Sequence, residues 1–344
     1  MKKYYWIFFF LFISITTFGL DRNTFAEPND SLYYSRLKNM FTLRVFSGQK
    51  FSNFGINDRE NKLELAFKAN PSSSIGIGGS YKWISVNLGI GVSNSLDSVF
   101  GEARKIDFQT NLYLRNLRIN IYSSVYNGFY LKNTKDYLAN SQYYYRPDIQ
   151  TKTFGLSTLY VVNSKRYSTK ATFLQNEWQK KTAGSLVIGG SIIYNRIKAD
   201  STLIPYFAID NNFLEGKGFT KNRYFALGGN AGYAFTLVIM KRLFLDFSLM
   251  GGFAYGNTTI RTVENDEFSS LKLKLTLLNT VGFGYNGERL YVGFNYSGFM
   301  TGAPLPFKHA GMNLNVGKVR FVLAYRFKIK EHANILPVWM PFEL

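Results

Sequence analysis

The stretch Val319-Arg320-Phe321-Val322-Leu323-Ala324-Tyr325-Arg326-Phe327-Lys328-Ile329 carries the clearest structural signal in the chain. Its odd-numbered positions are all apolar or aromatic, whereas its even-numbered positions include three cations. Successive side chains of a β-strand point to opposite faces, so this alternation predicts a strand with one apolar and one basic face. The apolar face needs a nonpolar environment, and the basic face needs water or polar partners.

The same period of two recurs along the chain. Ile84–Ser93, Tyr224–Thr236 and Leu290–Gly298 each place mostly bulky apolar residues on one face and mostly small or polar residues on the other. From this parity we expect the following residues to face lipid: Phe225, Leu227, Phe294, Leu323 and Tyr325. Further strands are expected at Phe41–Phe46, Leu63–Phe67, Ile75–Tyr81, Lys105–Leu114, Leu117–Tyr126, Ile149–Val162, Tyr167–Leu174, Ser185–Asn195, Leu243–Tyr255, Leu271–Tyr285 and His309–Val316.

Strand length favours a membrane-spanning β-barrel over a soluble β-sandwich. Many segments reach about 10 residues, which crosses a bilayer at a tilt, whereas strands of soluble proteins average about 5–6. Strands that cross a membrane must close into a ring, because an unpaired edge finds no partner in lipid. We therefore predict an all-β fold, an antiparallel transmembrane β-barrel of about 12–14 strands. The polar opposite faces suit a lumen and would fit the dry core of a sandwich poorly.

The expected turns leave the orientation of the strands open. Short turns are predicted at Arg115-Asn116, Asn286-Gly287 and Gly317-Lys318, among others. If every short turn were periplasmic, the strand that ends at Phe327 would run outward, against the usual inward finish. The longest break, Arg196–Arg223, contains Leu203-Ile204-Pro205-Tyr206-Phe207, which could be a further strand.

Composition excludes several classes of protein. The chain has 344 residues, a net charge of +19, no cysteine and two histidines. The absence of cysteine excludes disulfide scaffolds, thiolate metal sites and a cysteine nucleophile. A mean hydropathy of −0.11 argues against a bundle of transmembrane helices. We expect neither a metal nor any other cofactor.

The N-terminus has the features of an export signal. Met1-Lys2-Lys3 is basic, and Tyr4–Ile15 is a 12-residue run that is apolar apart from Ser14. That length fits a signal peptide and is too short for a spanning helix. Cleavage is expected after Gly19 or after Ala26. The predicted organisation is a signal peptide at 1–26, a periplasmic segment at 27–39, a barrel at 40–329 and a C-terminal tail at 330–344.

Several stretches resemble a family of uncharacterised Bacteroidota outer-membrane β-barrel proteins, a domain of unknown function. The first is Asn70-Pro71-Ser72-Ser73-Ser74-Ile75-Gly76-Ile77-Gly78-Gly79-Ser80-Tyr81-Lys82-Trp83. Later matches, in order, are Tyr126–Leu131, Arg146–Ile149, Gln179–Ser185 and the closing Ala324–Phe327. The resemblance implies an outer-membrane barrel in a Gram-negative bacterium and brings no known reaction. This chain departs from the family pattern after Phe327, because it continues to Leu344.

Catalytic groups are sparse. A lipid hydrolase would need a serine, a histidine and an orienting residue, and the candidates are Ser297 and His309. The alternative, that His309 is an ordinary polar loop residue with no catalytic role, is favoured. Glu264, Asp266 and Glu267 could hold a hard cation, but a solvated acidic loop is the commoner reason for such a cluster. We therefore expect a protein that is not an enzyme.

The basic excess is the more informative feature. Nucleic-acid binding is not expected, because the cations do not form one contiguous soluble patch. In an exported barrel, cations can instead meet the phosphates of outer-membrane lipid and lipopolysaccharide. By parity, Arg320, Arg326 and Lys328 should face the lumen, where Asp246 or Glu64 could pair with them.

Two functions follow from the state of the lumen. Paired cations would make a closed, structural or lipid-interacting barrel, whereas cations that line water would make a passive, anion-preferring pore for small solutes. The discriminator is whether Arg196–Arg223 or the N-terminal segment Glu27–Lys38 folds inward as a plug.

Overall fold

The structure is a computed structural model that describes residues 30–37, 40–70, 73–81, 84–91, 104–113, 116–138, 143–210 and 212–329. The predicted signal peptide with its two cleavage positions and the predicted tail at 330–344 lie outside these residues. Of the predicted periplasmic segment at 27–39, residues 30–37 are described.

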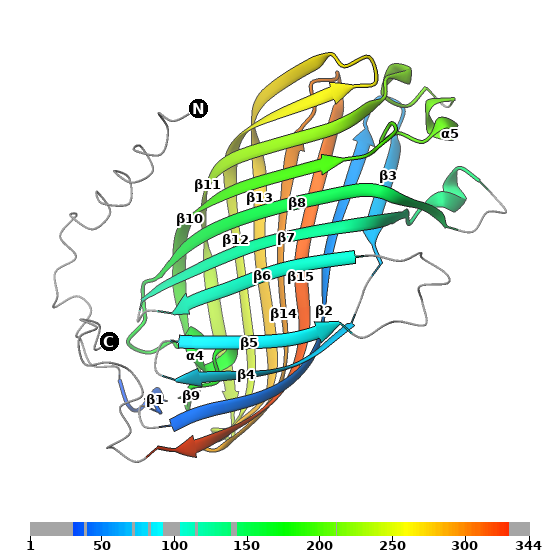
Figure 1. Cartoon of the computed structure of the whole chain (residues 1–344). Helices are drawn as coiled ribbons and strands as arrows, with labels where there is room; N and C mark the ends of the chain where they lie inside the picture. Colours follow the sequence, from blue (N-terminus) through cyan, green and yellow to red (C-terminus); the bar gives the residue numbers. More distant parts are fainter. Residues whose placement is uncertain are drawn as a thin grey trace, which may run out of the picture.

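Ten antiparallel strands close into a ring in the described part of the chain, because the last of them, β15, pairs with β2 (Figure 1). Around the ring they are β2 (Met40–Asp58), β3 (Leu63–Ala69), β7 (Leu117–Leu131), β8 (Tyr144–Val161), β10 (Ala183–Lys198), β11 (Phe219–Ile239), β12 (Leu243–Thr262), β13 (Glu267–Asn286), β14 (Leu290–Pro304) and β15 (Ala310–Lys328). The predicted antiparallel β-barrel is confirmed, but its closed ring has ten strands rather than the predicted 12–14.

Three more strands bring this sheet to thirteen. β4 (Ser73–Tyr81) continues the pairing of β3 along β2, β5 (Ile84–Gly91) pairs with β4, and β6 (Arg104–Tyr113) pairs with β7. At one end of the barrel β3 pairs directly with β7. The three strands therefore widen the wall toward the other end.

Several strand boundaries differ from the prediction. The predicted turn at Gly317-Lys318 lies inside β15, so the segments predicted on either side of it form one strand. The predicted strand Tyr167–Leu174 is instead the short helix α4 (Thr169–Phe173). The break after β10 contains α5 (Tyr206–Ile209) and a 3-10 turn at Phe213–Gly216 rather than a strand.

The merged strand β15 removes the orientation conflict. β2 begins and β15 ends at the same end of the barrel, where Met40 pairs with Lys328. The short connections 240–242 and 287–289 lie at this end, which we call the terminal end. The 199–218 connection lies at the opposite end, which we call the loop end. The last strand therefore runs toward the terminal end.

Side chains alternate between lumen and outer surface along every long strand. In β12, for example, odd-numbered residues from Leu243 to Tyr255 point outward, whereas even-numbered residues point inward. The outer wall is a continuous band of exposed apolar side chains, which include Val45, Ile77, Leu88, Leu249, Leu275 and Phe321. Soluble proteins rarely expose such a large apolar surface, so the band is suited to lipid. Among the described helices, none is long and apolar enough to cross a membrane.

Candidate functional site

The terminal end of the lumen is filled by a segment that we call the plug, residues 163–182 together with β1 (Tyr34–Arg36). Within it, α4 begins at Ser168, whose side chain accepts a hydrogen bond from the Ala171 amide. The plug continues through β9 (Glu177–Gln179), which pairs with β1 in a separate two-stranded sheet. Part of the predicted N-terminal candidate, Glu27–Lys38, thus joins the plug.

Wall side chains donate hydrogen bonds to backbone carbonyls of the plug. Tyr291 Oη donates to the Thr172 carbonyl at 3.1 Å, and Ser80 Oγ donates to the Leu174 carbonyl at 3.0 Å. Gly282 of β13 faces the plug helix α4, and a Cβ at this position would lie only 2.6 Å from Cγ2 of Thr172. The absence of a side chain at that position lets the plug helix approach the wall.

Arg326 is the main polar anchor of the plug, and it is 1% exposed. Its Nε donates to the Gln175 carbonyl at 2.6 Å, and its Nη2 donates to Asn286 Oδ1 at 2.8 Å. Its Nη1 donates to the carbonyls of Gly287 and Glu288, the latter at 3.3 Å. A charged guanidinium that donates to four acceptors in this way contributes more to the stability of the closure than a neutral donor would.

The predicted acidic partners of the inward cations are in other places. Asp246 is buried, but its Oδ2 accepts from Thr236 Oγ1 at 2.6 Å and from Tyr167 Oη at 3.2 Å. Glu64 is exposed near the loop end, far from Arg326 along the wall. From the sequence we expect one of two environments for the inward cations, pairing with acids or contact with water. Arg326 has a third, because it donates to backbone carbonyls instead of carboxylates.

The other two predicted lumen cations differ from Arg326. Arg320 points inward and stacks its guanidinium over the Phe46 ring, at 4.2 Å from the ring centroid. Lys328 is the last residue of β15 and is exposed at the terminal end. The three cations therefore do not form one cluster.

The loop end is closed by an apolar cap, residues 199–218. Its buried side chains pack against apolar residues of the wall on strands β2, β3, β7 and β8, and together they form the largest core cluster. The ring of Phe207 lies 5.6 Å from that of Tyr137 and 5.3 Å from that of Tyr144. The cap residues in this cluster are Ala199, Leu203, Ile204, Phe207, Ala208, Phe213 and Leu214.

A polar clasp fastens the cap to β8. Arg146 forms an ion pair with Asp148 at 2.7 Å, and its Nη1 donates to the Thr202 carbonyl at 2.9 Å. Asp148 also accepts from the Asp200 amide at 3.2 Å. The hydrogen bonds from Arg146 lower the pKa of Asp148 below its usual value, since they stabilise the charged carboxylate.

Asp58 fastens the cap to the end of β2 in a similar way. Its Oδ2 accepts from the Leu214 amide at 2.9 Å and from Asn61 Nδ2 at 2.9 Å. Burial alone would raise the pKa of Asp58, but the hydrogen bonds from Asn61, Leu214 and Glu60 outweigh it and lower the pKa.

A cavity of about 130 Å³ lies between the plug and the cap, and much of its lining is apolar. Three cations, Lys50, Arg118 and Lys318, contribute to its lining, and no carboxylate does so among the described lining residues. Hydroxyl and amide side chains such as Ser297 and Asn279 also line it. The middle of the lumen thus combines apolar side chains with three basic ones.

The outer wall carries a second basic feature near the loop end. Six cations lie at outward positions of the neighbouring strands β8, β10, β11 and β12, and we call them the cation array. They form one row of Lys152, Arg196 and Arg223 and a second row of Lys198, Lys221 and Arg261. Residues in each row face one another directly across the strand ladder.

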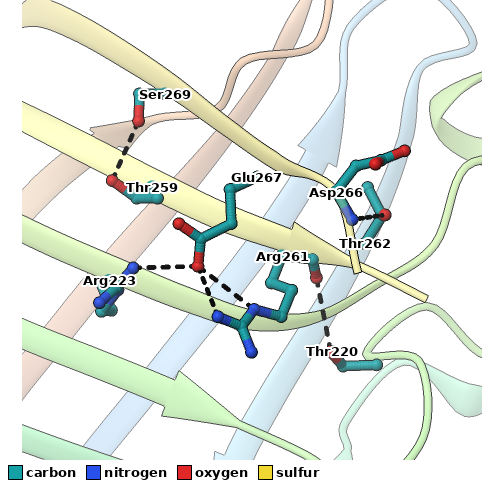
Figure 2. Close-up of polar contacts among 8 residues, drawn as sticks. All are labelled: Thr220, Arg223, Thr259, Arg261, Thr262, Asp266, Glu267 and Ser269. Atoms are coloured by element: carbon teal, nitrogen blue, oxygen red, sulfur yellow. Dashed lines mark hydrogen bonds and ion pairs between the residues drawn. The ribbon is translucent and has the colours of Figure 1, made fainter. Parts of the chain in front are cut away.

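Glu267 of β13 lies opposite Arg261 on the strand ladder and binds two of the arginines (Figure 2). Its Oε1 accepts from Arg223 Nη2 at 3.2 Å and from Arg261 at 2.8 Å (Nη2) and 3.2 Å (Nε). A hydrogen bond between Thr259 and Ser269, 3.1 Å long, lies beside this cluster. Both arginines and Glu267 stay about 40% exposed, so the cluster is open to a ligand.

The five predicted lipid-facing residues all lie on the outer wall. Phe225, Leu227, Leu323 and Tyr325 are exposed there, and Phe294 is partly covered because it stacks on Phe283, with ring centroids 5.1 Å apart. Their contact with lipid stays a prediction.

The two predicted hydrolase residues do not meet. Ser297 lies in the middle of β14 beside the cavity, whereas His309 lies beyond the end of that strand, in the connection to β15 at the loop end. The seven steps along the strand from Ser297 to Pro304 alone span roughly 23 Å. The hydrolase alternative based on this pair is therefore wrong.

The acidic cluster is also divided. Glu267 is bound to Arg223 and Arg261, whereas Glu264 and Asp266 are exposed in the neighbouring turn. Among the described residues, no group of three potential metal ligands is assembled.

Sequence reasoning missed residues 163–182 of the plug and the cation array. Neither carries a motif, because the plug is held through backbone carbonyls and the array depends on the register of four strands. The signal available for the array was the outward parity of Lys152, Arg196 and Arg223 relative to the aromatic residues Phe154 and Tyr194.

Residues 28–327 match the family described as a domain of unknown function (DUF4421). No protein with a curated description matches the sequence. Among solved structures, the outer membrane protease OmpT from Escherichia coli is similar at 11% identity and a TM-score of 0.40, over 85% of this chain and 98% of that one. Neisserial surface protein A is similar at 7% identity and a TM-score of 0.26, over 82% and 96%. Ail of Yersinia pestis follows at 10% and 0.23, over 84% and 99%. These likenesses concern the fold alone.

Proposed function

We propose that this chain, which belongs to the family described as a domain of unknown function (DUF4421), is an outer-membrane barrel closed to solutes. Its role is structural or is exerted at its lipid-facing surface. The observation that carries the proposal is closure of the lumen at both ends, by the plug at one and the cap at the other. In this orientation the terminal end faces the periplasm, because outer-membrane barrels keep their short turns there.

Conductance tests the closed state directly. The full-length protein, purified and reconstituted in a planar bilayer, should give no steady current. A variant that lacks both closures, with residues 163–182 and residues 199–218 each replaced by a short Gly-Asn turn, should conduct, because neither end of the lumen is then filled. Steady current through the unaltered protein would contradict the proposal.

A passive pore is the second candidate, and the cations that line the cavity favour it. If the lumen opened, Lys50, Arg118 and Lys318 would select for anions. The variant that lacks both closures should therefore show a reversal potential that favours chloride over potassium. Preference for cations would contradict the anion-selective version of this candidate.

Location has its own test. Export by a signal peptide and a Bacteroidota origin stay predictions, and so does residence in the outer membrane. We expect the mature chain to fractionate with the outer membrane and to resist extraction by alkali and salt, because its outer wall is apolar. Recovery in the soluble periplasmic fraction after gentle lysis would contradict this location.

A further inference from the structure

We propose that the cation array is a binding site for the headgroup of an anionic glycolipid of the outer leaflet, with lipopolysaccharide as its ligand. The site is on the outer wall and is independent of whether the lumen conducts. Four features of the described residues support it: direction, charge, position relative to the membrane and asymmetry around the barrel.

The array points away from the lumen. The residues that alternate with its members are buried inside the barrel: Asn195 and Ile197 on β10, and Asn222 and Tyr224 on β11. Because alternate residues of a strand face opposite sides, the cations between them lie on the outer surface. A ligand can therefore reach them from the lipid or from the solution above it.

The charge of the array is more than one phosphate can neutralise. Six cations and Glu267 give the array itself a net charge of +5, and the exposed carboxylates of Asp200, Glu264 and Asp266 lie in the connections beside it. Within the array, Lys221 pairs across the strand ladder with both Lys198 and Arg261. A phosphate monoester carries about −1.5 to −2 at neutral pH. The array therefore fits a headgroup with at least two anionic groups, which a phospholipid with one phosphate lacks.

The geometry suits phosphate. Neighbouring strands lie about 4.8 Å apart, and the two rows of the array are two residues, about 7 Å, apart along the strands. Planar guanidinium groups bind phosphate oxygens with two parallel hydrogen bonds. Glu267 holds Arg223 and Arg261 side by side in advance, which reduces the cost of ordering them when a ligand binds.

The array lies at the level expected for lipid headgroups. Two residues farther from the loop end, Phe154, Tyr194 and Phe225 form an outward aromatic row on the same strands, in register with one another. Aromatic rows mark the interface between hydrocarbon and headgroups in outer-membrane barrels. The cations directly above this row therefore face the headgroups of the leaflet at the loop end, which is the outer leaflet in the orientation proposed above.

The opposite side of the barrel has no such feature. Near the loop end, the outward positions of β14, β15 and β2 carry no charged residue within 298–304, 311–317 and 51–57. They include Met300, Asn313, Asn315, Asn53 and Asn57. Cations at outward strand positions are thus present on β8, β10, β11 and β12 and absent from these stretches of the opposite wall, so one face of the barrel is suited to an anionic ligand.

Binding of purified lipopolysaccharide to the full-length protein in a nonionic detergent tests the site. The array variant is Arg196→Gln/Lys221→Gln/Arg223→Gln. The matched control is Lys132→Gln/Lys135→Gln/Lys308→Gln, which removes three exposed cations from connections at the same end. We expect the array variant to bind at least tenfold more weakly than the unaltered protein, and the control to stay within about twofold. Equal binding by the array variant would overturn the site.

Two further probes define the ligand. Phosphatidylglycerol in the same detergent, which has one phosphate, should bind much more weakly than lipopolysaccharide; equal affinity would overturn the requirement for two anionic groups. Deacylated, phosphorylated lipopolysaccharide sugar should bind through the same residues but more weakly than the intact lipid. If it bound as tightly, a soluble anionic sugar rather than a membrane lipid would be the ligand.

A milder variant keeps the test decisive if the triple variant does not fold. Lys221→Gln leaves the cluster of Glu267 with Arg223 and Arg261 intact and removes one cation from the centre of the array. We expect about threefold weaker binding and a shallower dependence of affinity on salt concentration. An unchanged affinity together with an unchanged salt dependence would overturn the proposal.

Discussion

The two ends of the lumen are closed by opposite means. At the terminal end, polar side chains of the wall such as Arg326 and Tyr291 donate to backbone carbonyls of the plug. At the loop end, apolar side chains of the cap pack against the apolar wall, with Phe207 and Leu203 among them. The plug is thus held by directional bonds, and the cap by burial of apolar surface.

This difference determines how each closure should fail. Burial is non-directional, so the cap should lose stability in proportion to the apolar volume that a mutation removes. A hydrogen-bonded closure depends on matching donors with acceptors, and it is weakened most when a buried acceptor loses its donor. Four changes, from the largest expected effect to the smallest, test whether the two closures behave in these ways.

The largest effect is expected for Phe207→Ala in the cap. Phe207 is buried between Tyr137 and Tyr144, and the loss of a buried phenyl ring costs about 3–5 kcal/mol. The cap should detach while the strand ladder stays intact. Limited proteolysis should therefore cleave residues 199–218 in a barrel that keeps its heat resistance on gels.

The neighbouring Tyr206→Ala is the control for this change. Tyr206 is 65% exposed, so its removal should leave the cap resistant to protease. Similar cleavage in both variants would contradict a cap held by buried apolar contacts.

The next effect is expected for Arg326→Met at the plug. The substitution keeps much of the side-chain volume but leaves the Gln175 and Gly287 carbonyls without their charged donor, at a cost of about 1.5–3 kcal/mol. The plug should loosen, and limited proteolysis should cleave residues 163–182 while the cap stays protected. Lys328→Met removes an exposed cation from the same strand and should leave the plug resistant to protease. Similar cleavage of the plug in both variants would exclude a specific anchor.

The contrast between the two closures also explains what the sequence reveals. The two-residue period identified most strands because it is a local property of each segment. The turn predicted at Gly317-Lys318 was wrong, because Gly317 lies inside β15. A side chain at this position would overlap the ring of Phe51. There, glycine allows close packing between strands and does not make a turn.

The plug could not be recognised for a related reason. Its alternating stretch Tyr167–Leu174 looked like a strand but contains the helix α4. Its acceptors are mostly backbone carbonyls, which every residue type has. The cation array could not be recognised from the sequence either. Lys152 and Arg261 lie on the same patch of the outer wall only because of the register of the strands between them.

A smaller effect is expected when acid weakens the cap. The folded-state pKa values of Asp148 and Asp58 are lowered. The stability that these two carboxylates give to the cap is therefore fully present above the ordinary carboxyl pKa of about 4. It is lost as the pH falls below that value through the lowered pKa. Hydrogen exchange of residues 199–218, corrected for the intrinsic effect of pH, should rise in that range.

Asp148→Asn should remove part of this response. At neutral pH the variant should lose roughly 1–2 kcal/mol of cap stability, because Arg146 then binds a neutral amide. Its exchange should depend less on pH than that of the unaltered protein. An identical pH profile in the two proteins would show that the clasp between Arg146 and Asp148 does not fasten the cap.

The smallest effect is expected at the N-terminal part of the plug, where Tyr34→Phe removes one neutral donor. Tyr34 is 2% exposed, and its hydroxyl donates to the Ser164 carbonyl at 2.9 Å. The phenyl ring of the variant still fills the same space, so the loss should be about 0.5–1.5 kcal/mol in the free energy of unfolding measured with urea. Tyr33→Phe is the matched control, because the Tyr33 ring keeps its contact with the Arg166 guanidinium, 5.0 Å from the ring centroid. If Tyr34→Phe cost as much as Phe207→Ala, the terminal closure would depend on packing, and the distinction between a hydrogen-bonded plug and an apolar cap would fail.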